Sequence, residues 1–126
     1  MWKVLVVSGS VKEVVKIQGV IGDEYSFYLA ADVQQALKCF IVYNPDIILV
    51  DPELEEGRGL SLIKEFSQRK KIVMALSAKG KISNIEKAMA GGARCFLLEP
   101  VIPEIVAERI KSYMNEESEK FNSAAI

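Results

Sequence analysis

The sequence contains no histidine, and this absence narrows the chemistry available to the protein. Nucleophilic catalysis by a serine–histidine or cysteine–histidine pair is excluded, and so is the usual imidazole metal site. Any chemistry in this chain therefore has to use carboxylates, hydroxyls and the backbone.

Long apolar runs, clustered cysteines and an excess of one charge are lacking too. No stretch reaches the length of a membrane span. The apolar start "MWKVLVV" is too short for a signal peptide and lacks the flanking residues of one. Cys39 and Cys95 have no metal or redox spacing, so we predict burial of both as small apolar residues. The 16 basic and 17 acidic residues give a net charge of −1, which does not favour direct contact with nucleic acid. We therefore expect a cytoplasmic protein without membrane contact.

Five short apolar segments alternate with segments of helix length along a chain of one-domain size. The apolar segments are Trp2–Val7, Tyr25–Leu29, Asp46–Val50, Ile72–Leu76 and Cys95–Leu98. Segments that are apolar throughout are typical of strands covered on both faces, as in a parallel sheet. Five strand–helix units imply right-handed crossovers, so we predict an α/β fold built as a three-layer sandwich.

Helix start signals precede several of the intervening segments. Three stretches have the pattern of capping boxes: Ser10–Glu13, Asp32–Gln35 and Ser83–Glu86. The segment 11–21 is rich in Val and Ile, but its capping box and its place between two strands favour a helix over a strand. A further helix is indicated by the apolar spacing of Leu60, Ile63 and Phe66.

Pro103 suits the first turn of a last helix. The predicted apolar stripe of this helix consists of Ile105, Val106, Ile110, Tyr113 and Met114. From Asn115 onward the sequence is polar, and we expect it to fray or to lead into a linker. The predicted organisation is one domain over residues 1–114 followed by a tail over 115–126.

Functional residues of open α/β sheets gather at the carboxyl ends of the strands. Here those ends carry Ser8 to Ser10, Asp51, Ser77 and the dipeptide Glu99-Pro100. We therefore expect these residues to share one edge of the sheet.

In order and spacing, these residues resemble the receiver domain of bacterial response regulators, the CheY-like fold. The resemblance covers residues 2 to about 114 and rests on "PDIILVD" ending at Asp51, Gly59, Ser77 in "ALSA", Phe96 after "GGARC", and Glu99-Pro100. It implies a flavodoxin-like, doubly wound sheet of five parallel strands in the order 2-1-3-4-5, with two helices on one face and three on the other. It also implies a cis peptide bond before Pro100.

Receivers accept a phosphoryl group from a sensor histidine kinase, with Mg²⁺, on the aspartate that follows the third strand. The resemblance assigns this role to Asp51, the phosphoryl-binding hydroxyl to Ser77, and the aromatic whose rotamer reports activation to Phe96. Glu53 lies where a backbone carbonyl normally reaches the metal. Simpler alternatives are an inherited solvated carboxylate at Asp51, a loop cap at Ser77 and plain packing at Phe96.

Three departures from the family pattern affect this chemistry. Ser8 and Gly9 stand where receivers have the two acids that hold Mg²⁺, and Glu99 stands where they have a lysine that pairs with the phosphoryl group. Glu55 stands where they usually have a proline. Phosphoryl transfer depends on neutralising charge with a metal and a cation. If Asp51 and Glu99 lie about 5 Å apart at an effective dielectric of about 20, their repulsion is about 3 kcal/mol, which would raise a carboxyl pKa.

Three hypotheses follow. The first is an atypical receiver, not an enzyme, that signals through contact with a kinase or effector protein and needs no cofactor. The second is a working receiver phosphorylated on Asp51, in which Glu53 or Glu99 replaces the missing Mg²⁺ ligands. The third is an unrelated α/β enzyme or nucleotide-binding module, although "SGSVKE" matches no glycine-rich phosphate loop. Sequence alone does not separate the first two, and the three departures lead us to predict the first.

The predicted contact surface is the one through which receivers usually dimerise or dock. It comprises the helix near residues 82–89, the strand Cys95–Leu98 and the last helix, and it would serve a partner or a homodimer. Its candidate residues are Ile82, Ile85, Met89, Lys111 and Tyr113.

Overall fold

A computed structural model describes residues 2–9, 12–77 and 79–124 of the chain. Within these residues the strands are β1 (Trp2–Val7), β2 (Tyr25–Ala30), β3 (Ile47–Val50), β4 (Ile72–Ser77) and β5 (Phe96–Leu98). They form one parallel sheet in the order β2-β1-β3-β4-β5, as predicted. Each strand boundary lies within one residue of the predicted one.

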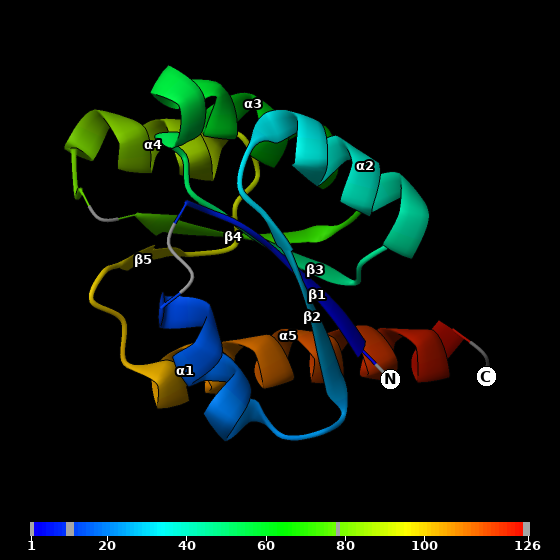
Figure 1. Ribbon diagram of the computed structural model, residues 1–126. Coiled ribbons are helices and arrows are strands. Elements are labelled where there is room, and N and C mark those ends of the chain that lie inside the picture. The colour runs from blue at the N-terminus through cyan, green and yellow to red at the C-terminus, as the bar shows by residue number, and fades with distance from the viewer. Residues whose placement is uncertain (1, 10–11, 78, 125–126) are drawn as a thin grey trace.

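Within the same residues, four helices connect the strands and a fifth follows β5. They are α1 (Lys12–Ile21), α2 (Val33–Tyr43), α3 (Leu54–Gln68), α4 (Ile82–Ala90) and α5 (Pro103–Ala124). Figure 1 shows α1 and α5 on one face of the sheet and α2, α3 and α4 on the other. The three-layer sandwich and the distribution of its helices are confirmed, and so is a helix between β1 and β2.

The core consists of two apolar layers, one on each face of the sheet. Successive residues of β3 point to opposite faces, so Ile47 and Leu49 join the layer under α1 and α5, whereas Ile48 and Val50 join the layer under α2, α3 and α4. All four side chains are fully buried. Burial on both faces explains why this segment is apolar throughout.

The capping boxes have three different outcomes. Asp32 caps α2, because its Oδ1 accepts a hydrogen bond of 2.8 Å from the Gln35 backbone N–H. The box at Ser83 is wrong: α4 begins at Ile82, so Ser83 lies inside the first turn, and the cap residue Lys81 makes no side-chain capping bond. The box that starts at Ser10 lies outside the described residues.

The apolar stripe of α5 is narrower than predicted. Val106, Ile110 and Met114 recur at four-residue spacing and are buried, and Tyr113 packs against the same layer. Ile105 is exposed, because it lies about 100° around the helix from Val106. The helix also continues through the polar segment to Ala124, so residues 115–124 are helical rather than frayed.

The two cysteines are free thiols, with Cys95 buried and Cys39 partly buried. Among the described residues, no helix combines the length and apolarity needed to cross a membrane.

Candidate functional site

The carboxyl ends of four strands meet at one edge of the sheet. Val50, the last residue of β3, is level with Val7 of β1 and Ala75 of β4, so Ser8 and Asp51 leave neighbouring strands side by side. The Asp51 backbone N–H donates to the carbonyl of Val7 at 3.0 Å. The structure thus brings together the strand ends that the sequence singled out.

Asp51 is a half-buried carboxylate held by its own loop. Its Oδ1 accepts a hydrogen bond of 2.9 Å from the backbone N–H of Glu53. Burial raises the pKa of Asp51, and this rise is opposed by the Glu53 hydrogen bond and reinforced by the negative charge of the Glu53 side chain. Burial is the largest cause of the rise, and Glu53 is the carboxylate that adds to it.

The side chain of Glu53 connects the β3–α3 loop to α4. Its Oε1 accepts a hydrogen bond of 2.8 Å from the side-chain amide of Asn84. Glu53 therefore contacts both the candidate acceptor, through its backbone, and α4, through its carboxylate. Sequence reasoning missed Asn84, because nothing in the sequence relates residues 31 positions apart.

The loop after Asp51 turns left-handed before α3 becomes regular. Glu55, Glu56 and Gly57 have positive φ angles of 47°, 59° and 97°. This conformation directs the Glu55 carboxylate to α2, where Oε2 accepts a hydrogen bond of 3.1 Å from the Val33 N–H. Glu55 thus satisfies a backbone donor in the first turn of α2, a role that the sequence did not indicate.

Gly59 allows α3 to approach the strand end closely. A Cβ at this position would collide with the carbonyl oxygen of Asp51. Glycine is therefore required at this position by the packing of the helix against the loop.

Ser77 ends β4 as a fully buried residue. Its hydroxyl donates to the carbonyl of Lys79 at 2.8 Å and accepts from the Lys79 N–H at 3.1 Å. In this structure the hydroxyl therefore caps the following loop, which is the simpler of its two predicted roles.

Ser8 and Gly9 follow β1 and present little side-chain chemistry. Ser8 is partly exposed, and its backbone N–H donates to the carbonyl of Ala30 at 3.0 Å. A Cβ at Gly9 would meet no atom within 4 Å. Position 9 could therefore accommodate a larger side chain without a steric clash.

Glu99 follows β5 beside Ser77. It is partly buried, and its backbone N–H donates to the carbonyl of Ser77 at 2.8 Å. The Glu99-Pro100 peptide bond is cis, as predicted. Phe96 of the same strand is partly buried and packs against the layer under α2, α3 and α4.

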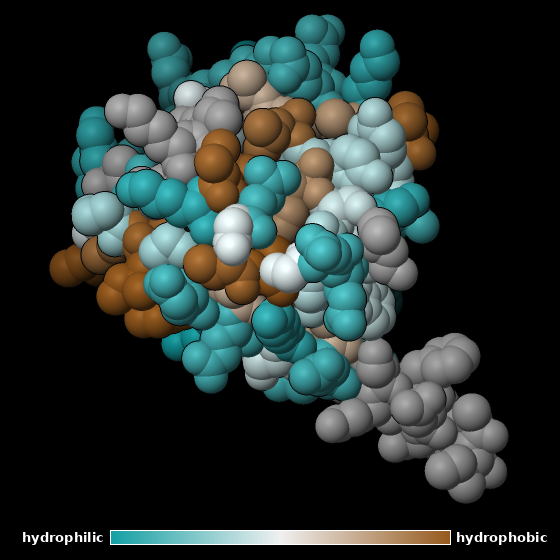
Figure 2. All heavy atoms as spheres, turned by 60° about the horizontal axis from the view of Figure 1, so that its bottom comes forward, coloured by the Kyte–Doolittle hydropathy of each residue, from teal (hydrophilic) through white to brown (hydrophobic). Residues whose placement is uncertain are grey.

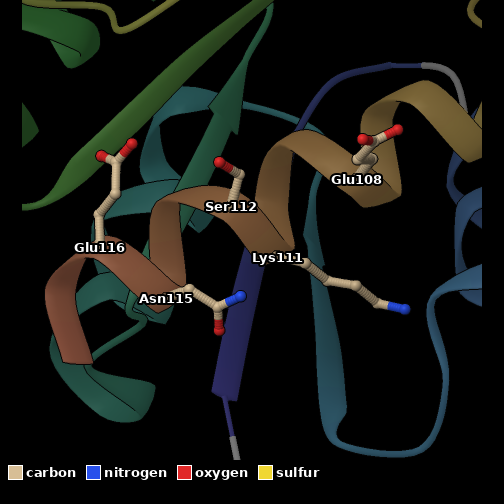
Figure 3. Close-up of a pocket in the computed structure, with 5 residues that line it drawn as sticks. All are labelled: Glu108, Lys111, Ser112, Asn115 and Glu116. Atoms are coloured by element: carbon tan, nitrogen blue, oxygen red, sulfur yellow. The ribbon is translucent and has the colours of Figure 1, made fainter. Parts of the chain in front are cut away.

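Within the described part of the chain, no three His, Cys, Asp or Glu side chains come together as a candidate metal centre. A hollow of about 350 Å³ lies instead on α5, lined by Glu108, Lys111, Ser112, Asn115 and Glu116. Figure 3 shows that these side chains all come from one helix and do not converge on a common point, so the hollow is not part of the strand-end site.

Comparison with known proteins agrees with this fold. A family model described as the response regulator receiver domain matches residues 4–111. The chemotaxis protein CheY of Bacillus subtilis (strain 168) is 30% identical over 84 residues, which are 64% of this chain and 69% of CheY.

Solved structures with this fold include a CheY-like response regulator receiver domain protein from Methanospirillum hungatei JF-1. It has 18% identity and a TM-score of 0.83, over 95% of this chain and 98% of that one. A response regulator protein from Burkholderia pseudomallei, solved with a phosphorylated aspartic acid, calcium ion and citrate, has 22% identity and a TM-score of 0.74, over 93% of this chain and 75% of that one.

The fold is therefore that of the CheY-like α/β proteins. The chain belongs to the response regulator receiver domain family and is a receiver of two-component signal transduction. This membership excludes the hypothesis of an unrelated α/β enzyme or nucleotide-binding module.

Proposed function

We propose that this receiver signals through protein contact, without ordinary Mg²⁺-dependent phosphorylation of Asp51, and that it is not an enzyme. The environment of Asp51 carries the proposal. Burial and the Glu53 carboxylate both disfavour negative charge on Asp51 and so raise its pKa. A phosphoryl group on Asp51 would replace one negative charge with about two at the same place, against the same opposition.

The donor groups at the end of β1 support the proposal. Mg²⁺ is held in proteins by carboxylates and other hard oxygen ligands. At the two positions where receivers have acids, Ser8 offers a neutral hydroxyl and Gly9 has no side chain. These residues do not fit the metal that the family uses, so we assign no step to a metal here.

The charge of Glu99 at the end of β5 also supports the proposal. Receivers have a lysine where this chain has Glu99, so the charge available to a phosphoryl group is reversed in sign. Phosphoryl transfer depends on positive charge at the transferred oxygens, which a carboxylate does not supply.

A surface for protein contact is available on α4, β5 and the start of α5. Its exposed apolar side chains are Ile82, Met89, Leu98, Ile102 and Ile105. Figure 2 shows apolar atoms gathered at the left of the α1–α5 face, over the β5–α5 connection. We propose this surface for a kinase, an effector protein or a second copy of the chain in the cytoplasm. Two predicted members contribute less, because Ile85 and Tyr113 are partly buried.

Chemical phosphorylation tests the proposal directly. The protein is incubated with acetyl phosphate, or with beryllofluoride, with and without millimolar Mg²⁺. We expect no phosphoryl mass gain by intact mass spectrometry and no Mg²⁺-dependent NMR shifts around Asp51. Robust Mg²⁺-dependent phosphorylation at Asp51 would contradict the proposal.

A restored variant supplies the matched control. Ser8→Asp, Gly9→Asp and Glu99→Lys together return the family's charges, and the open space at Gly9 admits the new side chain. We expect this triple variant to gain Mg²⁺-dependent phosphorylation, and the same variant with Asp51→Asn to lose it again. Failure of the triple variant to gain phosphorylation would show that the three departures are not the cause.

The alternative is a receiver that still accepts a phosphoryl group on Asp51 from a sensor histidine kinase. The observation that favours it is that the acceptor and the hydroxyl are both present. Oδ1 of Asp51 accepts a hydrogen bond from the Glu53 backbone N–H, and the next strand, β4, ends in the buried Ser77. The acetyl phosphate experiment separates the two functions.

A further inference from the structure

The outer face of α2 exposes an apolar stripe. Leu37 and Ile41 are four residues apart and lie on the same side of the helix, with Ile41 80% exposed and Val42 63% exposed. A surface helix normally turns polar side chains to this side. An uncovered stripe of this kind marks an interaction site more often than isolated apolar residues do.

A groove runs beside this stripe, between α2 and α3. It encloses about 60 Å³ and is lined by Leu37, Phe40, Ile41, Glu65, Phe66 and Arg69. The rings of Phe40 and Phe66 stack with their centroids 4.6 Å apart, so the apolar wall is held by packing between the two helices. A groove of this size accepts one or two side chains.

The borders of the stripe are basic. The Arg69 guanidinium lies 5.8 Å and the Lys71 ammonium 5.9 Å from the centroid of the Phe40 ring. On the other side, exposed Lys38 lies between Ile41 and Val42 around the helix, at 100° per residue.

A neighbouring carboxylate offsets one of these cations, Arg69, but not the two lysines. The α2 sequence VQQALKCFIVY contains no acidic residue. The carboxylate of Glu65 is already paired with Arg69, at 2.8 Å. Lys71 and Lys38 therefore supply the positive charge on the two sides of Leu37 and Ile41.

We propose that the α2–α3 groove docks an acidic amphipathic helix of a partner protein. Apolar side chains one turn apart on that helix enter the groove against Leu37 and Ile41, and its flanking carboxylates face Lys38 and Lys71. The narrow groove suits inserted side chains rather than a flat membrane surface. This surface lies on the opposite helical layer from α5 and does not depend on whether Asp51 is phosphorylated.

The test uses the full chain, ¹⁵N-labelled, and two synthetic helical peptides. Both peptides carry leucines at i, i+4 and i+7; one has glutamates beside them and the other has lysines at the same positions. We expect the glutamate peptide alone to shift resonances of α2 and of the end of α3, with binding that weakens as salt is added. Ile41→Ser and Lys38→Glu should each weaken it by at least about tenfold. Val15→Ser, which changes an apolar residue on α1 that is 60% exposed, should leave the binding unchanged.

Several results would overturn the proposal. They are equal shifts from the two peptides, no shifts from either at millimolar concentration, and undiminished binding by Ile41→Ser. Light scattering adds another: a dimer of the unmodified chain that Ile41→Ser dissociates would make a second copy the occupant. Binding of α2 to anionic vesicles without a preference between the peptides would make it a membrane surface.

Discussion

The side-chain amide of Asn84 donates a hydrogen bond of 2.8 Å to the carboxylate of Glu53 and so joins α4 to the loop beside Asp51. The backbone N–H of the same Glu53 binds the Asp51 carboxylate at 2.9 Å. One residue therefore contacts both the candidate acceptor and a helix of the proposed contact surface. A change in the charge of Asp51 has a short physical route to α4.

Replacing Glu53 by glutamine should lower the pKa of Asp51. The substitution removes the negative charge that raises this pKa, and it keeps both the backbone donor and a side-chain oxygen for Asn84. The pKa should stay above its ordinary value, because burial is the largest cause of the rise. A carbon-detected NMR titration of the Asp51 carboxyl measures it. Glu56→Gln, an exposed change in the same loop, is the control, and an unchanged pKa in Glu53→Gln would contradict the assigned cause.

Asp51→Asn should stabilise the folded protein at neutral pH. The folded state raises the pKa of Asp51, so it binds a proton more tightly than the unfolded chain does. The contribution of Asp51 to the free energy of unfolding therefore falls as pH rises from the ordinary carboxyl pKa through the raised one, and it reaches its lowest value above both. Asparagine keeps an acceptor for the Glu53 amide and carries no charge. Urea unfolding should show that the variant is more stable than the original protein at pH 7. The two should be equally stable at a pH below both pKa values. Equal stability at pH 7 would contradict this prediction.

The fold was predictable because its signals are local. The four residues of β3 are apolar without interruption because both faces of the strand are covered, and that pattern can be read directly from the sequence. Asp32 likewise bonds to a backbone N–H only three residues away. Ser83 shows the limit: its pattern fits a capping box, but the helix begins earlier, at Ile82, with Lys81 as its cap.

The site was predictable only in part, because its details depend on contacts between distant residues. The strand order brings Ser8 and Asp51 to one edge, and this follows from topology. The bond from Asn84 to Glu53 and the reach of Glu55 to Val33 join residues 31 and 22 positions apart. Glu55 also requires a left-handed backbone that glutamate seldom adopts, so its sequence position did not indicate its contact.

Gly59→Ala should destabilise the protein by about 1–3 kcal/mol, the usual range for forcing atoms into a packed site. Its Cβ would collide with backbone atoms of Asp51, and backbone moves less readily than a flexible side chain. Gly19→Ala is the matched control, because it lies in α1 and its Cβ would meet nothing within 4 Å. That change should stabilise the protein by about 0.5–1 kcal/mol, since alanine suits a helix better than glycine. Chemical denaturation measures both, and equal effects of the two substitutions would contradict the close packing of α3 on the loop.

Introducing the family's usual proline at position 55 should destabilise this particular receiver by about 1–3 kcal/mol. Glu55 has φ 47° and ψ 57°, whereas proline holds φ near about −65°, so the loop would have to refold. The substitution also removes the carboxylate that accepts from the Val33 N–H at the start of α2. Two variants separate these effects: Glu55→Gly loses the same hydrogen bond but tolerates positive φ, and Glu55→Gln keeps an acceptor oxygen in the same conformation. Chemical denaturation should rank the proline variant lowest, with Glu55→Gln close to the original protein. Unchanged stability of Glu55→Pro would mean that this loop follows the family's ordinary path, and the left-handed turn together with its contact to α2 would then be wrong.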